Sequence, residues 1–203
     1  MKLMQPIIAI ALTGPLLATT INHVESVDGE LSGNNLAPTV LGTFGVGTSS
    51  VSGTIVDALG VNGAANVNVD VFTFEVAAGS LLSGISVSNF VSIDNVAFLA
   101  LNDSASFPFD ATALGNDPDQ TQFIGGNLFG EVVGSNIIDI IGDGAIGTGF
   151  SGPLGEGNYT LYLQQLGGSS VDYTIEFDVT NVPEPSSAAL LGLGAFAFLR
   201  RKR

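Results

Sequence analysis

The sequence predicts a mainly β protein: a single antiparallel β-sandwich or jelly roll, flanked by an N-terminal signal helix and a C-terminal hydrophobic helix. Three observations support this fold class. Short segments alternate apolar and polar residues with the period of a strand, turn residues separate them, and no part of the body has a convincing helical pattern. The 27 glycines and 13 phenylalanines among 203 residues, with many valines, isoleucines and threonines, suit short strands joined by tight turns rather than helices. We see no internal repeat.

The N-terminus is predicted to be a secretory signal peptide, residues 1–20. Lys2 precedes an apolar segment, 7–17, and small residues follow it. Cleavage after Ala18 or Thr20 fits this pattern. A permanent membrane helix is the alternative, but the segment is shorter than the about 20 residues that span a bilayer and is broken by proline.

Residues 21–180 are predicted to form the only domain, because about 160 residues suffice for one hydrophobic core. The segment 137–141 is either a strand or a short apolar turn. Between 102 and 157 the chain is least regular, and turn residues mark loops there. Strands are expected at residues 51–56, 71–76, 82–91, 96–101, 159–164 and 171–179.

The burial of three strands follows from their patterns. In 171–179 the odd positions are apolar and the even positions are polar, so that one face packs on the core. In 71–76 the even positions are predicted to face the core and the odd positions to face solvent. The segment 96–101 is continuously apolar, which indicates burial on both faces.

Charge is distributed very unevenly along the chain. The five basic residues are Lys2 and the four that end the chain, whereas residues 3–199 carry all 19 carboxylates and no lysine or arginine. Each carboxylate of the body must therefore be solvated, hydrogen-bonded or matched by a bound cation. Nucleic-acid binding is excluded, since phosphate neutralisation needs basic side chains. The chain has no cysteine, so an exported form has no disulfides.

The C-terminal segment, residues 181–203, has three features in a fixed order: a Pro-Glu-Pro motif, an uncharged apolar stretch and a basic stop. This order is expected when the end of the chain stays cytoplasmic and the preceding part is exported. The uncharged residues 185–199 make about 22 Å of helix, less than the about 30 Å of a hydrocarbon core, and so form a marginal permanent span. The motif comprises Val182, Pro183, Glu184 and Pro185, and the stop comprises Arg200, Arg201, Lys202 and Arg203.

This tail resembles the PEP-CTERM sorting signal of Gram-negative bacteria, over about a tenth of the chain. The resemblance implies a protein that crosses the inner membrane, is handed to an exosortase, is cut near the Pro-Glu-Pro motif and reaches the cell surface or extracellular matrix. A plain tail anchor is the alternative. The two prolines favour an extended approach to the membrane, which a processing enzyme needs and an anchor does not.

The body also resembles a known family. Residues 68–79 resemble the D-x-D-x-F-x-F-x-V-x-A-G signature of bacterial pre-peptidase C-terminal (PPC-like) domains. Residues 154–163 resemble their L-x-x-G-x-Y strand, and 171–175 their final Y-x-L strand. Such domains are small β-sandwich modules of secreted enzymes. The long middle loop of this chain departs from the shorter family form.

The resemblance also implies a calcium site, because some of these domains bind calcium through the acidic segment before the first core strand. Oxygen ligands around a glycine suit such a hard cation, although the spacing is not that of an EF-hand. Asn68 stands where the family has an aspartate, and solvated carboxylates are the alternative. The candidate ligands are Glu25, Asp28, Glu30, Asn68 and Asp70.

The sequence does not predict an enzyme. His23 is the only histidine and is expected to be solvated, and no Gly-x-Ser-x-Gly nucleophile motif occurs. The glycines of 142–147 lack the strand and helix of a dinucleotide site and indicate a turn. Asp172, Glu176 and Asp178 share one strand face, which is expected to be a solvated surface rather than a catalytic carboxylate pair.

These observations favour a structural or adhesive protein of the cell surface or matrix, associated with exopolysaccharide or a biofilm. A calcium-dependent or carbohydrate-binding accessory module that uses the loop 102–157 is the alternative. A small secreted hydrolase is the third reading.

Overall fold

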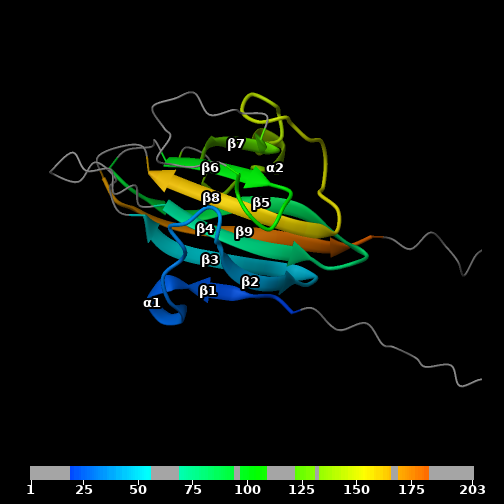
Figure 1. Cartoon of the computed structure of the whole chain (residues 1–203), viewed down its shortest axis with the longest axis horizontal. Coiled ribbons are helices and arrows are strands. Elements are labelled where there is room, and N and C mark those ends of the chain that lie inside the picture. Colours follow the sequence, from blue (N-terminus) through cyan, green and yellow to red (C-terminus); the bar gives the residue numbers. More distant parts are fainter. Residues whose placement is uncertain are drawn as a thin grey trace, which may run out of the picture.

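A computed structural model describes residues 19–55, 69–93, 97–108, 122–130, 133–165 and 169–182. The predicted signal helix and C-terminal hydrophobic helix lie outside these residues. In the part that is described, two sheets pack face to face as a sandwich (Figure 1), which confirms the mainly β prediction. None of the helices in this part is long and apolar enough to span a membrane.

The first sheet has four strands in the order β1-β3-β9-β5. β9 pairs antiparallel with both β3 and β5. Its odd-numbered residues from Val171 to Val179 are buried, and its even-numbered residues are exposed or half-buried, as the alternation predicts. The strands are β1 (Asn22–Val24), β3 (Gly47–Ile55), β9 (Val171–Asn181) and β5 (Ser80–Val91).

The second sheet has five strands in the order β2-β4-β8-β6-β7. β8 pairs antiparallel with β4 and β6, and β7 closes the far edge. β7 was not expected, because its sequence Gly-Gly-Asn-Leu has no strand pattern. The strands are β2 (Thr39–Phe44), β4 (Val69–Val76), β8 (Gly157–Gln165), β6 (Ala97–Asn102) and β7 (Gly125–Leu128).

On one side of the sandwich the outermost strands pair in parallel. β1 runs parallel to β3, and β2 runs parallel to β4, so the purely antiparallel prediction is wrong for these two pairs. The reason is that the chain alternates between the sheets from β1 to β4, and paired strands are therefore not consecutive in sequence. Two helices of one turn, α1 (Glu25–Asp28) and α2 (Ile138–Ile141), complete the described elements. The apolar segment 137–141 thus forms a helical turn rather than a strand.

An aromatic cluster forms the middle of the core between the sheets. The rings of Phe44 and Phe74 stack with centroids 4.5 Å apart, and Phe177 of β9 lies 4.9 Å from Phe74. Phe72 meets Phe177 edge-on at 6.0 Å. Each such pair contributes about 1 kcal/mol beyond its buried area, so phenylalanines from both sheets fix how the two layers pack.

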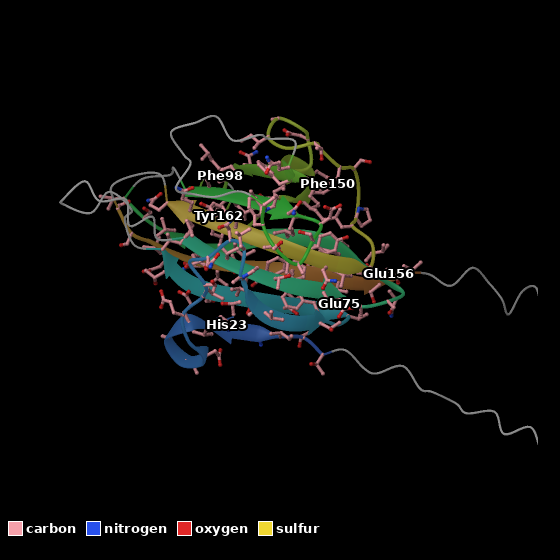
Figure 2. All side chains as sticks on the ribbon, viewed as in Figure 1. His23, Glu75, Phe98, Phe150, Glu156 and Tyr162 are labelled. Carbon is pink, nitrogen blue, oxygen red and sulfur yellow. The ribbon has the colours of Figure 1, made fainter. Side chains whose placement is uncertain are left out.

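A second apolar cluster covers the outer face of the second sheet. Val71 was predicted to face solvent, but it is fully buried, and Thr73 is only 5% exposed. Both predictions are wrong. Val71 packs with Phe107 and Phe123, which come from loops, and Phe107 stacks 5.1 Å from Tyr162. The hydroxyl of Thr73 donates to the carbonyl of Tyr159 at 3.0 Å. Figure 2 labels Tyr162 on β8 and Phe98 on the neighbouring β6. The same cluster packs on the outer face of β6 through Ala100 and Phe98, so both faces of this apolar strand are largely buried, as predicted.

Candidate metal centre

The candidate metal centre is built where the chain crosses from the first sheet to the second. β1 ends at Val24, α1 turns the chain, and Leu31 packs into the core. The N–H of Val71 in β4 then donates to the carbonyl of Ser32 at 2.8 Å. Residues 25–31 are therefore fixed at both ends, with one end on each sheet.

Three carboxylates meet at this crossing. Oxygen atoms of Glu25, Glu30 and Asp70 lie within 4.8 Å of one another. Glu30 is exposed, Glu25 is half-buried, and Asp70 of β4 is fully buried. The cluster therefore leads from solvent into the interior of the sandwich.

Glu25 is oriented by two backbone groups. Its Oε1 accepts a hydrogen bond from the N–H of Leu31 at 2.9 Å, and its Oε2 accepts one from the N–H of Thr54 at 2.8 Å. Thr54 belongs to β3, and β1 ends before it can pair with this residue. The carboxylate thus accepts a backbone hydrogen bond of β3 beyond the point where β1 stops pairing with it. Both carboxylate oxygens are held by backbone N–H groups without a bound ion.

Gly53 of β3 makes room for this carboxylate. It occupies an inward-facing position of the strand, between the buried Val51 and Ile55. A Cβ at this position would collide with Oε2 of Glu25 and would lie 2.7 Å from the hydroxyl of Tyr173. A glycine inside a strand often marks a close approach of this kind. The absence of a side chain here is therefore part of the site.

Asp70 is the buried end of the cluster. Its Oδ2 accepts a hydrogen bond from the hydroxyl of Tyr173 at 2.8 Å. Its Oδ1 is also buried but has no hydrogen-bond partner among the described residues. Buried polar atoms are nearly always paired, because losing water without a new partner costs free energy. A bound cation would give this oxygen the partner that it lacks.

The protonation of Asp70 reflects this environment. Burial raises the pKa of Asp70 to about 8, and repulsion from Glu25 adds to the rise; the hydrogen bond from Tyr173 opposes it, and Glu30 raises it further. Burial, then the charge of Asp70, raises the pKa of Tyr173 well above its usual value. Tyr173 therefore stays protonated and donates, while Asp70 is mainly protonated at neutral pH unless a cation compensates its charge.

The donor set fits calcium. Carboxylate oxygens are the ligands that a hard cation prefers, and three carboxylates from two separate parts of the chain converge here. Two unit charges about 5 Å apart repel by about 3 kcal/mol at an effective dielectric constant of about 20. A divalent cation bound by Glu25, Glu30 and Asp70 would turn this repulsion into attraction.

Among the described residues, one predicted ligand, Asp28, does not join this cluster. The Oδ2 of Asp28 accepts a hydrogen bond from the N–H of Val24 at 2.8 Å, on the exposed side of α1. Asn68 lies outside the described residues. The structure thus brings together Glu25, Glu30 and Asp70 from the predicted set.

His23 is not solvated, contrary to the prediction. It lies on β1 (Figure 2) and is 9% exposed. Its Nε2 lies 3.0 Å from the carbonyl oxygen of Gly29. A carbonyl only accepts, so Nε2 carries the proton and donates. The alternation of β1 turns this side chain inward, where it holds the turn that follows α1.

The sorting residues lie at the edge of the described part. The N–H of Val182 donates to the carbonyl of Gly79 at 2.9 Å, which ties the end of β9 to the turn before β5. Pro183, Glu184 and Pro185 follow directly and lie outside the described residues. So do the four residues of the basic stop, Arg200, Arg201, Lys202 and Arg203.

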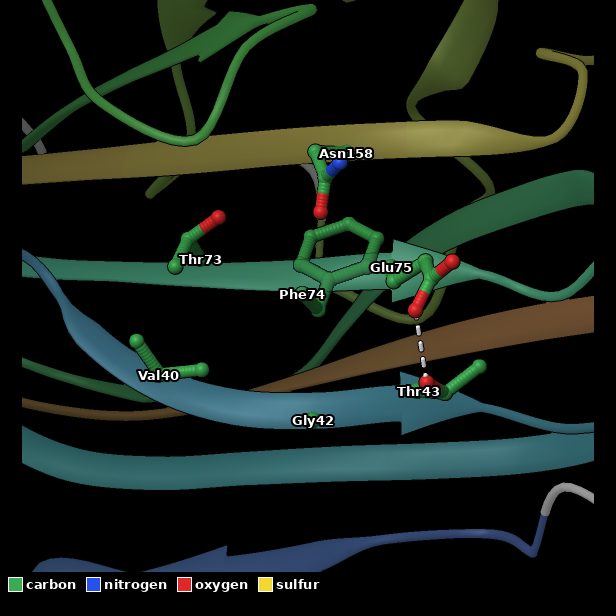
Figure 3. Close-up of a pocket in the computed structure, with 7 residues that line it drawn as sticks. All are labelled: Val40, Gly42, Thr43, Thr73, Phe74, Glu75 and Asn158. Carbon is green, nitrogen blue, oxygen red and sulfur yellow. Dashed lines mark hydrogen bonds between the residues drawn. The ribbon is translucent and has the colours of Figure 1, made fainter.

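Two hollows on the surface of the described residues bear on the site. The smaller one, of ≈ 90 Å³, lies on the outer side of β2 and β4 (Figure 3). There the hydroxyl of Thr43 donates to Glu75 at 2.8 Å, and the exposed Val40 and Asn158 flank the pair. The larger one, of ≈ 240 Å³, lies between α1 and the outer face of the first sheet.

The sequence did not identify three residues of the metal centre: Gly53, Thr54 and Tyr173. Gly53 offered a signal, since a glycine at a core-facing position of an alternating strand indicates close packing. Tyr173 was assigned to the core, and a buried tyrosine hydroxyl requires a partner. Thr54 acts through its backbone N–H, which no sequence pattern reveals.

The fold and the carboxylate cluster define an acidic, mainly β sandwich with a candidate cation site. The chain matches the PEP-CTERM protein-sorting motif over residues 181–203. This motif implies an exported protein that an exosortase sorts to the cell surface. No curated protein and no solved structure matches the chain. The resemblance of the body to PPC-like domains therefore rests on its sequence motifs.

Proposed function

We propose that the protein is a structural or adhesive component of the cell surface or extracellular matrix, and that calcium completes its β-sandwich. An exosortase at the inner membrane cuts the tail, and the released body works beside exopolysaccharide in a biofilm. Such a role depends on a stably folded domain that presents its surface to the matrix, and it needs no catalytic group.

The unpartnered Oδ1 of Asp70 carries the calcium part of this proposal. It is buried, it belongs to a residue with no exposed surface, and it lies beside the carboxylates of Glu25 and Glu30. One bound cation would satisfy this oxygen, compensate the charge of Asp70 once its proton has left, and remove the repulsion between Glu25 and Glu30. Without a bound cation, apolar neighbours would leave this oxygen unpaired and the carboxylate charges uncompensated.

Calcium would also stabilise the crossing between the sheets. Glu25 and Glu30 belong to the segment that leaves β1, whereas Asp70 belongs to β4. An ion held by all three would tie the N-terminal segment to the second sheet. The chain has no cysteine, so this tie would serve where small exported domains commonly use a disulfide.

Thermal unfolding of the purified protein tests the calcium site. After treatment with a chelator, added calcium should raise the melting temperature, because a ligand that binds only the folded state stabilises it. At a concentration of about 100 times Kd the gain is about 2.7 kcal/mol. No shift at millimolar calcium would remove the calcium part of the proposal.

Three variants make this test specific. Asp70→Asn and Glu30→Gln should lose most of the calcium-dependent shift, because each removes a charged ligand. Asp28→Asn is the matched control, since Asp28 is acidic, lies on the same segment and stays outside the cluster. An equal loss in Asp28→Asn would indicate general charge screening instead of a defined site.

The matrix role is tested in the cells that make the protein. We expect the mature body to fractionate with the cell surface or with exopolysaccharide, and its deletion to weaken the matrix or adhesion. A protein found only as free monomer in the medium, with an unchanged matrix after deletion, would contradict this role.

A further inference from the structure

The larger hollow has a definite place in the fold. It lies over the outer face of β3 and β9, with α1 as one wall and the end of β5 as another. Its volume of ≈ 240 Å³ is below the about 300–1,000 Å³ of pockets for drug-sized ligands, so one small ring fits it. Apart from Glu25 and Tyr173 of the metal centre, its polar side chains are Ser26, Ser52, Thr54, Asn89, Asp172 and Thr174.

The hydrogen bonds within the hollow leave mainly acceptors free. The hydroxyl of Thr54 donates to Oδ1 of Asp172 at 2.7 Å, so its hydrogen is used and its lone pairs remain. Ser52 and Thr174 share one hydrogen bond of 2.9 Å, which leaves one hydroxyl hydrogen between them. Around Asp172 and Thr54 the free groups are acceptors, so a ligand that brings donors to this part of the hollow is favoured.

The charge of the hollow points the same way. Asp172 lines it, and the body contains no lysine or arginine to neutralise this carboxylate, whereas Glu25, which also lines the hollow, is assigned to the calcium site. A carboxylate, sulfate or phosphate would be repelled. An ammonium group brings three N–H donors and the missing positive charge at once.

The remaining side chains suit a polyhydroxylated ring. Asn89 is exposed, and its amide offers both a donor and an acceptor. The hydroxyl pair of Ser52 and Thr174 offers the same combination. Val24, which is 38% exposed, supplies an apolar side against which C–H groups of a ring can lie.

We propose that this hollow binds a hexosamine with a free ammonium group, as a residue of a cationic polysaccharide. The ammonium is received by Asp172 and Thr54, and the ring hydroxyls by Asn89 and the Ser52–Thr174 pair. This inference rests on the proposed association with exopolysaccharide and names the sugar class that the body recognises. It places recognition on the first sheet instead of the loop 102–157.

The same sheet provides a matched control. Asp178 lies on β9 like Asp172, and the hydroxyl of Thr48 in β3 donates to it at 2.7 Å, the same distance as in the Thr54–Asp172 pair. Asp178 and Thr48 do not line the hollow. Asp172→Asn and Asp178→Asn thus remove the same charge from the same face, and they differ in their relation to the hollow.

The test is titration of the purified protein, in calcium-containing buffer, with a glucosamine tetramer, an N-acetylglucosamine tetramer and spermidine. Binding is followed by calorimetry and by NMR shifts of the Asn89 amide. We expect the glucosamine tetramer to bind, the acetylated tetramer not to bind, and Asp172→Asn to weaken binding by up to about fivefold, as for an exposed ion pair. Asp178→Asn should bind like the unchanged protein.

Three results would overturn the inference: no binding of the glucosamine tetramer, equal losses in the two variants, or spermidine binding with the same dependence on Asp172. Unchanged melting of Asp172→Asn verifies its fold, and Asn89→Ala provides a second variant that keeps the charge. Association with a neutral or acidic exopolysaccharide in the absence of glucosamine binding would leave the matrix role standing and refute the hexosamine site alone.

Discussion

The hydroxyl of Tyr173 donates to the carboxylate of Asp70 at 2.8 Å, and this single hydrogen bond joins the two layers of the sandwich through its interior. Tyr173 comes from β9 in the first sheet, and Asp70 comes from β4 in the second. Both side chains are almost completely removed from solvent. A polar contact of this kind specifies one alignment of the sheets, which apolar packing alone does not.

Substitution Tyr173→Phe should therefore destabilise the protein while keeping its shape. It leaves a buried carboxyl group without its donor, at a cost of about 1–3 kcal/mol in the free energy of unfolding. Urea unfolding measures this cost. Tyr159→Phe is the control, because its hydroxyl donates at 2.9 Å to the carbonyl of Gly155 in a turn at the surface. An equal or larger loss in Tyr159→Phe would contradict a special role for the Tyr173–Asp70 bond.

Substitution Gly53→Ala should abolish the effect of calcium. The added Cβ collides with the carboxylate of Glu25, which must leave its position over β3. The variant should show little or no calcium-dependent rise in melting temperature. Gly155→Ala is the matched control, since a Cβ there meets nothing within 4 Å and its backbone needs no positive φ. A full calcium response in Gly53→Ala would exclude Glu25 as a ligand.

The stability of the metal-free protein should fall as the pH rises from about 4 to about 8. In this range Asp70 is ionised in the unfolded chain but still protonated in the folded one, because burial raises its pKa to about 8. The folded state then binds the extra proton, and each pH unit costs up to about 1.4 kcal/mol. The measurement is denaturant unfolding across this range. Asp70→Asn, which cannot titrate, should lose this part of the slope.

Calcium affinity should have the opposite dependence on pH. Calcium must displace the proton of Asp70, so the apparent affinity should rise by up to about tenfold per pH unit and level off above about pH 8. Calorimetry in buffers of different ionisation enthalpy would also detect the released proton. An affinity that is constant from pH 6 to pH 8 would show that Asp70 is not a ligand.

The mature protein should lack the residues that follow Pro185. Cleavage near the Pro-Glu-Pro motif removes the apolar stretch and the basic stop, a mass loss of about 2 kDa in addition to the signal peptide. Intact-mass spectrometry of the surface protein measures this loss. Recovery of a chain that still ends at Arg203 would favour the tail anchor instead.

Local alternation was sufficient to predict strands, but it did not reveal what covers them. The odd and even positions of β9 have the burial that their sequence predicts. In β4 the same reasoning failed for Val71, because Phe107 and Phe123 cover it from distant loops. Burial by a remote loop leaves no trace in the period of the strand itself.

In the candidate site, too, the residue types could be predicted from the sequence, whereas the contacts between distant residues could not. The acidic segment and Asp70 could be named from the sequence, since their residue types alone suit a cation. Which carboxylates meet could not be predicted, because that depends on the crossing between sheets and on the inward space at Gly53. Asp28 illustrates the limit: it is three residues from Glu25, yet it accepts a hydrogen bond from Val24 on the other side of the turn.

The lack of basic residues in the sandwich has a practical consequence for its detection. Between Lys2 and Arg200 the chain contains no lysine and no arginine. Trypsin therefore has no peptide bond to cut in the body, folded or unfolded, and amine-reactive labels find only its α-amino group. Surveys of surface proteins that depend on tryptic peptides or lysine labelling will overlook it, whereas proteases that cut at acidic or aromatic residues will reveal it.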